Sequence, residues 1–388
     1  MFAAVHGVSC GDASSSRGDA AYGGAPLSWS WNSVPNDAAD VEAASGGTSR
    51  PPVGAANSLL SRRRRKKRRR GRSLRLVLAY DGAKFCGWQA QQTYEARLLA
   101  NSSSSPPLPS VQGTVVDALT PLLGDGAGAA PVDVRACGRT DAGVSSIGQI
   151  CRVRTGRTPT EVPLRAVAAA LELENPSVVA GGCENDLALR CLSVREEGRA
   201  FHPKFGARCR SYIYLWDLSE ENEENGPFAL REEHVRAVDA MLRKLTEAGP
   251  LDYVAASYGR TRTETTACRL LWDRAFPVDL LPDDREDARR GDNAPGGRRS
   301  VSRGADAMCV ELIGDRFLRR MVRILVAIVV REAVREARKA EGTSEAAGCG
   351  GEDALLNIVL SKKRSRCARP AAAEGLIFVS AHFGDREQ

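Results

Sequence analysis

The sequence predicts an α+β protein built from two similar halves. Apolar residues that alternate along the chain indicate strands, and apolar residues spaced by three or four positions indicate helices. The order strand–helix–strand–strand–helix occurs once in the first half and again, with one further strand, in the second. The 388 residues suffice for a large core, and a hydrophobic content of 43% is ordinary for a globular protein.

The first half is predicted to begin with a strand at Leu74, because large apolar side chains occupy every second position up to Tyr80. Asp81-Gly82 is typical of a turn and ends this strand. Apolar residues at helical spacing predict a helix over 111–122, which the glycines of 124–130 end. The other elements expected here are strands over 132–137 and 150–153, with a loop between them, and a helix over 164–173.

The second half repeats this pattern and adds a last strand. Its predicted strands cover 212–216, 268–276, 308–313 and 376–383, and its predicted helices cover 234–248 and 317–337. Surface loops are expected at a Ser/Pro stretch over 98–109 and at polar inserts over 220–225, 283–304 and 341–353.

The positive charge of the chain is confined to its N-terminal arm, residues 1–73. The arm holds twelve Lys and Arg against five acids, so the formal net charge of +7 arises there and the body is neutral. This excludes a diffuse, histone-like basicity. Because the arm is rich in Ala, Gly, Ser and Pro, it is predicted to be disordered. Its basic tract, 62–72, fits a nuclear import signal, an electrostatic arm for nucleic acid or part of an organelle-targeting leader, although the five acids count against the leader.

Several classes of protein are excluded by pattern. The most apolar stretch, 324–330, is too short to span a bilayer, and the first thirty residues lack the features of a secretory signal. The eleven cysteines include no CxxC pair, and none of the four histidines is spaced with them as a zinc site requires. We therefore expect an intracellular protein with reduced, mostly buried thiols and no bound metal.

The densest chemical signal is the run CGRTDAGV, Cys137–Val144, between two predicted strands. Its glycines let the backbone turn sharply and clear bulk from around Asp141. Arg139, two residues earlier in a tight loop, can keep the carboxylate of Asp141 charged and oriented. The alternative is an ordinary turn in which Asp141 caps its own backbone.

Six further motifs accompany this run in a fixed order. They are Tyr80-Asp81-Gly82, Phe85-Cys86-Gly87-Trp88-Gln89, Val111-Gln112-Gly113, Arg210-Ser211-Tyr212-Ile213-Tyr214, Phe317-Leu318-Arg319-Arg320-Met321-Val322-Arg323 and Glu374-Gly375-Leu376. Over residues 74–383 the set resembles the TruA family of tRNA pseudouridine synthases. The resemblance implies two ferredoxin-like halves, 74–200 and 201–388, which form a continuous, mostly antiparallel sheet with helices packed on one side and a catalytic cleft between the halves.

The resemblance also implies an isomerase that converts uridine to pseudouridine in tRNA, in the anticodon stem-loop, without a cofactor. Asp141 matches the essential catalytic residue, which acts either as a nucleophile at C1′ or as a base at C2′. Three positions match substrate-binding residues. Arg139 matches the Arg that accompanies the flipped nucleotide, Tyr212 the Tyr that stacks on the target base, and Arg323 the Arg of the long helix that approaches the pocket. Read without the resemblance, Tyr212 has a second interpretation as a core aromatic on a strand.

The chain departs from the commoner family pattern at four places, one of which is Ala327, near the position after the Val-Arg of the long helix where Gly is common. Ser145 stands where many members have His, Arg319-Arg320 stand where His-His is common, and Leu251-Asp252-Tyr253 replaces His-Asp-Phe. These differences leave the target position open. Two alternative functions are a non-catalytic RNA-binding relative and the same chemistry on another structured RNA. Members of the family commonly work as homodimers, so the resemblance also implies a homodimer for this chain.

Overall fold

The structure of the chain is a computed structural model. It describes residues 73–94, 96, 108–124, 130–155, 162–174, 187–218, 230–259, 265–279, 305–340 and 351–384. The basic arm up to residue 72 and the inserts 220–225 and 283–304 lie outside the described residues, as do nearly all of the predicted loops 98–109 and 341–353.

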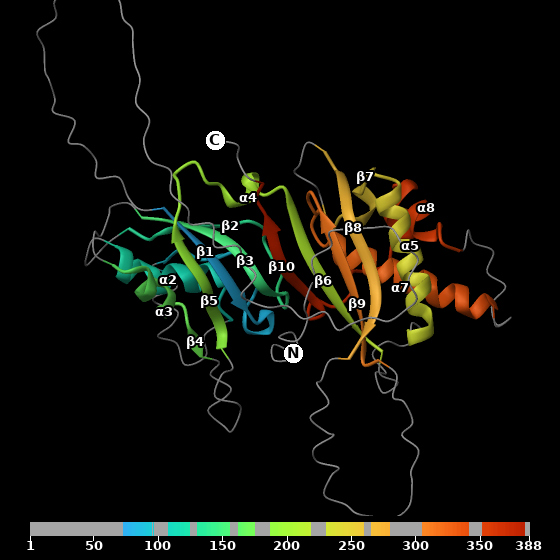
Figure 1. Cartoon of the computed structure of the whole chain (residues 1–388), viewed down its shortest axis with the longest axis horizontal. Helices are drawn as coiled ribbons and strands as arrows, with labels where there is room; N and C mark the ends of the chain where they lie inside the picture. Colours follow the sequence, from blue (N-terminus) through green and yellow to red (C-terminus); the bar gives the residue numbers. More distant parts are fainter. Residues whose placement is uncertain are drawn as a thin grey trace, which may run out of the picture. The chain divides into compact units, whose positions relative to one another are not determined.

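The N-terminal elements run from blue to green in Figure 1. They are β1 (Ser73–Tyr80), the short 3-10 turn η2 (Gly82–Lys84), α2 (Val111–Leu123), β2 (Asp133–Ala136), β3 (Ser145–Arg154), α3 (Leu164–Ala169), β4 (Leu173–Glu174) and β5 (Leu187–Glu196). The predicted β1, α2 and β2 are confirmed within a residue of their expected limits. The helix predicted over 164–173 is shorter, because 3-10 hydrogen bonds from Leu171 and Glu172 close its last turn.

Three strands of this half differ from the prediction: β3, β5 and the two-residue β4, which lies where the predicted helix was expected to end. β3 begins five residues before the expected start at Ile150, and its first residues are polar but buried and hydrogen-bonded: Ser146 Oγ donates to the carbonyl oxygen of Phe378. A hydrophobic pattern cannot reveal such residues. β5 was not predicted at all, although it pairs along the whole of β1.

The C-terminal elements run from light green to red in Figure 1. They are α4 (Pro203–Gly206), β6 (Cys209–Asp217), α5 (Val235–Glu247), β7 (Pro250–Asp252), β8 (Ala267–Val278), β9 (Ala307–Gly314), α7 (Met321–Ala340), α8 (Ala354–Leu360) and β10 (Leu376–His382). All six predicted elements are confirmed in type, whereas α4, β7 and α8 were not predicted. The long helix begins at Met321 rather than at Phe317, because Arg320 has a φ of 59° and this left-handed conformation cannot continue a helix.

One mixed sheet carries all ten described strands, in the order β4-β5-β1-β3-β10-β6-β9-β8-β7, with β2 paired to β3. Its pairs are antiparallel except β3 and β10, which run parallel in the middle (Figure 1). That parallel ladder is short: Ile377 lies opposite Ser145 and Phe378 opposite Ser146. The last strand of the chain therefore joins strands from the two parts of the sequence, and the α+β class is confirmed.

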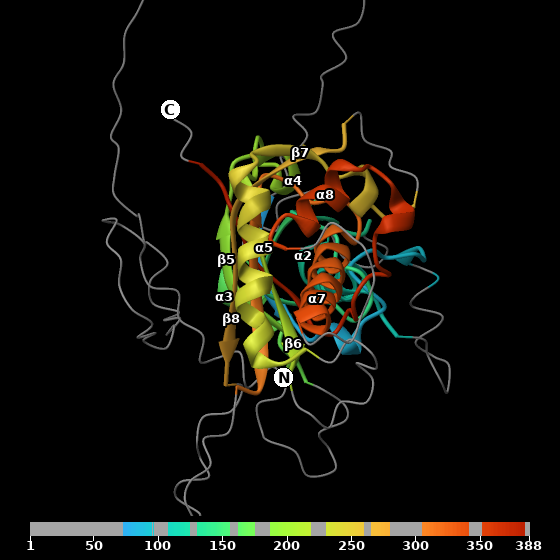
Figure 2. The same cartoon turned by 90° about the vertical axis from the view of Figure 1, so that its right-hand side faces the viewer.

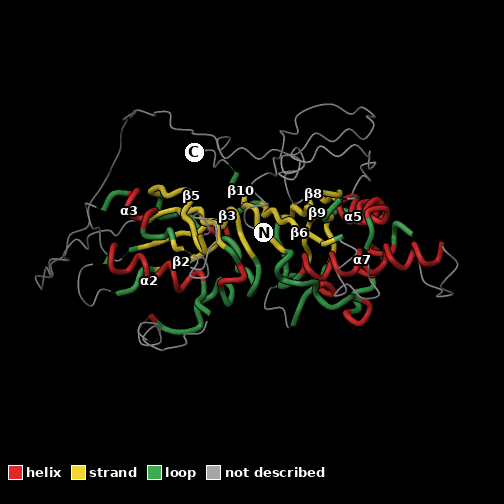
Figure 3. The backbone as a smooth tube through the Cα atoms, turned by 90° about the horizontal axis from the view of Figure 1, so that it is seen from below, coloured by secondary structure: helices red, strands yellow, loops and turns green. Residues whose placement is uncertain are grey.

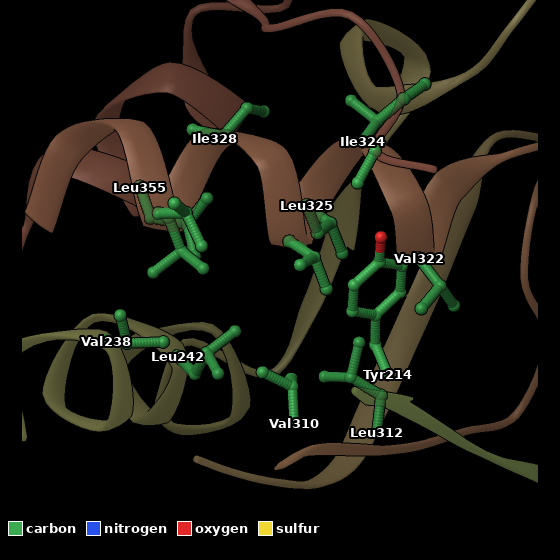
Figure 4. Close-up of a cluster of buried hydrophobic side chains, with 14 of the residues drawn as sticks. Tyr214, Val238, Leu242, Val310, Leu312, Val322, Ile324, Leu325, Ile328 and Leu355 are labelled. Carbon is green, nitrogen blue, oxygen red and sulfur yellow. The ribbon is translucent and has the colours of Figure 1, made fainter. Parts of the chain in front are cut away.

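Helices α2 and α7 lie on the same side of the sheet, below the strands in Figure 3. Two large apolar clusters fill the space between helices and sheet. One packs α2 and α3 against β1, β3 and β5, and the other packs α5, α7 and α8 against β6, β8 and β9. Figure 2 shows α5, α7 and α8 grouped at the end of the sheet that faces the viewer. In Figure 4, Leu325 of α7 lies across this core from Val238 and Leu242 of α5.

Eight of the eleven cysteines lie in the described ranges, where all are free thiols and five are buried. Burial raises the pKa of the Cys191 thiol to about 11, so this group is protonated and unreactive at neutral pH. Within the ranges described, no helix combines the length and the apolar character needed to cross a membrane.

Candidate active site

The connection between β2 and β3 holds Asp141 and is fixed by its neighbours on both sides. The carbonyl oxygen of Thr140 accepts from the backbone N–H of Trp88 at 3.1 Å, and the Thr140 hydroxyl shares a 2.9 Å hydrogen bond with Tyr80. Gln149 Nε2 donates to the carbonyl oxygen of Gly138 at 2.8 Å. A turn closed from Val144 N to the Asp141 carbonyl then presents the Asp141 side chain, which is 30% exposed. These hydrogen bonds fix the loop and hold one accessible carboxylate in a defined position.

Gly87 shows how closely the preceding segment approaches this loop. Its φ is +107°, and a Cβ there would lie 3.0 Å from Ala142 N and 3.1 Å from the Thr140 carbonyl oxygen. Only glycine therefore fits both the conformation and the space. Nearby, Ser145 Oγ accepts from the backbone N–H of Gly82 at 2.9 Å in a buried position. Ser145, which departs from the commoner family pattern, holds the end of β1 against the loop.

Two cations from the start of α7 reach the carboxylate of Asp141. Arg323 Nη1 lies 3.4 Å and Arg320 Nε lies 3.5 Å from Asp141 Oδ2. Arg323 is held in place, because its Nε donates to the carbonyl oxygen of Ala371 at 2.7 Å and its own carbonyl oxygen accepts from Ala371 N at 3.1 Å. The hydroxyl of Tyr214 donates to the carbonyl oxygen of Ala372 at 3.1 Å and so fixes the same segment. The predicted residues Asp141 and Arg323 are therefore brought into contact.

Tyr212 lies on β6 beside the same loop. Its ring meets Phe317 and Phe378 edge-on, with centroids 5.0 and 5.1 Å away, and its hydroxyl faces Gly138. Burial raises the pKa of Tyr212 far above its usual value, and the nearby Asp141 charge adds to this effect. The phenol is therefore neutral at physiological pH and can serve as an apolar surface or a hydrogen-bond donor.

Arg139 lies in the Asp141 loop, but no ion pair joins it to the Asp141 carboxylate in the described structure. Its side chain is exposed, and within the described part of the chain the ion pairs to Asp141 come from Arg320 and Arg323 instead. The idea that Arg139 itself orients the carboxylate has no counterpart in this geometry. Its exposure leaves it free to meet a bound molecule.

Sequence reasoning missed the part played by Arg320, which it treated only as a departure from the family pattern. Arg320 stands three residues before Arg323, and on or near a helix this spacing places two side chains on one face. The ring of Tyr258 lies 4.0 Å from the Arg320 guanidinium carbon and was not singled out either. The Arg320–Arg323 spacing is the signal that could have revealed this second cation.

The arrangement offers one carboxylate, two guanidinium groups and a partly buried aromatic ring. A carboxylate can attack an electrophilic carbon or accept a proton, and guanidinium groups bind anionic ligands. Among the described residues, no group of three or more His, Cys, Asp or Glu side chains is placed to hold a metal ion.

Three known proteins that are similar to this chain share one name. A protein called tRNA pseudouridine synthase A from Geobacter sulfurreducens is 29% identical over 254 residues, which cover 65% of this chain and 81% of that protein. Its namesake from Geotalea uraniireducens is 25% identical over 320 residues, which cover 80% of this chain and all of that protein. A third, from Dinoroseobacter shibae, is 36% identical over 139 residues, or 36% of this chain and 42% of that protein. No protein-family model matches the chain.

Proposed function

The chain belongs to the TruA family of tRNA pseudouridine synthases, and we propose that it isomerises uridine to pseudouridine in tRNA. The observation that carries this proposal is the exposed carboxylate of Asp141, held on a rigid loop within 3.5 Å of two guanidinium groups. Relatives that bear the name of this activity, one of them aligned over its full length, support it.

Asp141 is the proposed catalytic residue. The reaction breaks the bond between ribose C1′ and uracil N1 and forms a bond between C1′ and C5, while the proton lost from C5 is balanced by one gained at N1. The carboxylate starts the cleavage either by attack on C1′ or by removal of the C2′ proton, and both routes suit a single carboxylate. Because the substrate is only rearranged, the residues need to position and exchange protons, without a redox partner or a cofactor.

Three residues are proposed to bind the substrate. Arg323 orients the carboxylate and faces the reacting nucleotide from α7. Tyr212 supplies a flat surface for the uracil after it leaves the RNA stack. Arg139 is exposed on the Asp141 loop and fills the space that the extruded nucleotide leaves in the RNA stack. This contact offsets part of the few kcal/mol that base flipping costs.

The two parts of the chain, 74–200 and 201–388, are proposed to be ferredoxin-like halves with the catalytic cleft between them. Two separate apolar clusters, one in each part, support this division. The ion pair between Asp141 of the first part and Arg323 of the second supports a site at their junction. An anticodon stem-loop target, a homodimer and an intracellular location belong to the same proposal.

The function is tested by incubating the purified full-length chain with tRNA and mapping pseudouridine along the RNA. Product at defined positions is expected. Binding of tRNA without product would favour a non-catalytic RNA-binding relative, and product on a different structured RNA alone would favour the same chemistry on another substrate.

Substitution of Tyr212 separates its ring from its hydroxyl. Tyr212→Phe keeps the edge-to-face contacts with Phe317 and Phe378 and is expected to keep most activity, whereas Tyr212→Ala removes the ring and is expected to lose about 100-fold or more in single-turnover rate. Thermal melts check that both variants fold. Equal rates for the wild type and both variants would remove Tyr212 from the site.

The basic arm can be tested by deletion of residues 1–72. The cut spares Ser73, which pairs with Arg154 in β1. If the arm binds RNA, the slope of log affinity against log salt should fall by about 0.7 to 0.9 for each phosphate that the arm contacts, with turnover at saturating tRNA unchanged. An unchanged slope would leave nuclear import or another targeting role as the better account of the tract 62–72.

A further inference from the structure

Arg320 and Tyr258 form a stacked pair beside Asp141. The guanidinium carbon of Arg320 lies 4.0 Å from the centroid of the Tyr258 ring, within the range of a cation–π interaction. The backbone N–H of Tyr258 donates to the carbonyl oxygen of Arg319 at 3.0 Å, so the backbone of Tyr258 is held against the turn that carries Arg320. Tyr258 is 41% exposed. The pair is thus a fixed feature at the edge of the site rather than two separate surface side chains.

The hydrogen-bonding capacity of Arg320 is largely unused. Its Nε is buried and faces Asp141 at 3.5 Å, but it makes no hydrogen bond within the described part of the chain. Arg323, by contrast, already donates to Ala371 and is only 12% exposed, against 28% for Arg320. An arginine has five N–H donors. Arg320 therefore presents N–H donors to solvent next to the carboxylate. The guanidinium of Arg323, by contrast, is held by Ala371 and Asp141.

The charges at this point do not balance. Two guanidinium groups face one carboxylate, which leaves one positive charge in excess among these three side chains. The backbone of Arg320 is also in the left-handed region, with a φ of 59°. Such a conformation costs about 1–2 kcal/mol for a residue with a Cβ, and strained residues of this kind cluster at active sites and ligand-binding sites.

We propose that Arg320, braced by Tyr258, binds a phosphate of the RNA backbone next to the target uridine. This rests on the proposed function. The planar fork of a guanidinium matches two phosphate oxygens, stacking on an aromatic ring leaves its edge available, and a singly charged phosphodiester neutralises the excess charge. Arg320 is then a substrate-binding residue that the chain has in place of the histidine common in its family.

The test compares Arg320→Gln with wild type in the full-length chain. The measurements are tRNA affinity over a range of salt concentrations and single-turnover pseudouridine formation at saturating tRNA. A phosphate contact predicts an affinity loss of about tenfold at low salt and a salt slope lower by about 0.7 to 0.9. The rate at saturation should change much less than the affinity. Arg335→Gln, on α7 and paired with Glu332, is the matched control and should behave as wild type.

Two results would overturn the proposal. One is an unchanged affinity and salt slope; the other is an unchanged slope with a slower saturated rate, which would make Arg320 a positioning residue for Asp141. Arg320→Asn tolerates the left-handed backbone and replaces Arg320→Gln if the latter melts early. A wild-type chain that forms no pseudouridine would refute the proposed function instead, so the two failures are distinct.

Discussion

Asp141→Asn should abolish pseudouridine formation. The substitution keeps the size of the side chain but removes the negative charge that either route requires, so a loss of about 1,000-fold or more in single-turnover rate is expected. Binding of tRNA should persist or tighten, because Arg320 and Arg323 then carry two positive charges with no opposing carboxylate. The assay is a single-turnover reaction with excess enzyme, followed by mapping of pseudouridine.

Glu374→Gln is the matched control for this experiment. Glu374 is an exposed carboxylate beside the same loop: its Oε1 would lie 2.8 Å from a Cβ placed on Gly143. It makes no ion pair with Arg320 or Arg323 in the described structure. The control should retain activity within a few-fold of wild type. If Asp141→Asn stayed active while Glu374→Gln did not, the catalytic carboxylate would have been assigned to the wrong residue.

The elements that the sequence predicted correctly are those whose apolar spacing can be read within the element itself. β1 and α5 each bury one regular face, and their apolar spacing gave them almost to the residue. β5 was missed because its register against β1 shifts between Val77 and Leu78, which interrupts the alternation of buried and exposed residues. The early start of β3 was missed because its first buried residues are polar and are satisfied by partners far along the chain.

The residues of the candidate site also fall into two groups, those that sequence motifs identified and one that they did not. Asp141 and Arg323 were named from motifs, and the structure brings them together. The contact between Arg320 and Asp141 was missed because it depends on where the start of α7 meets the loop before β3, and the only sequence signal for it was the spacing of Arg320 from Arg323. The left-handed turn that aims Arg320 likewise falls inside a stretch whose apolar pattern predicted an unbroken helix.

Gly148→Ala is expected to destabilise the fold strongly. Gly148 lies in β3 where β10 crosses beside it, and a Cβ there would lie 2.1 Å from the carbonyl oxygen of Val379. Val379 sits at the irregularity in the β10–β6 ladder, between Phe378 and Ser380. Because the obstacle is backbone rather than a flexible side chain, the strands must separate, at a cost of about 3 kcal/mol or more.

The damage should extend from stability to activity. β3 carries the Asp141 loop, and the segment before β10 holds Arg323 through Ala371, so separating these strands moves the carboxylate away from its cations. Urea unfolding should show a lower midpoint, and single-turnover activity of the folded fraction should also fall. Gly198→Ala is the matched control, since a Cβ there meets nothing within 4 Å. If both variants unfolded at the wild-type midpoint, the β3–β10 contact would be looser than this packing requires, and the rigidity assigned to the Asp141 loop would need another source.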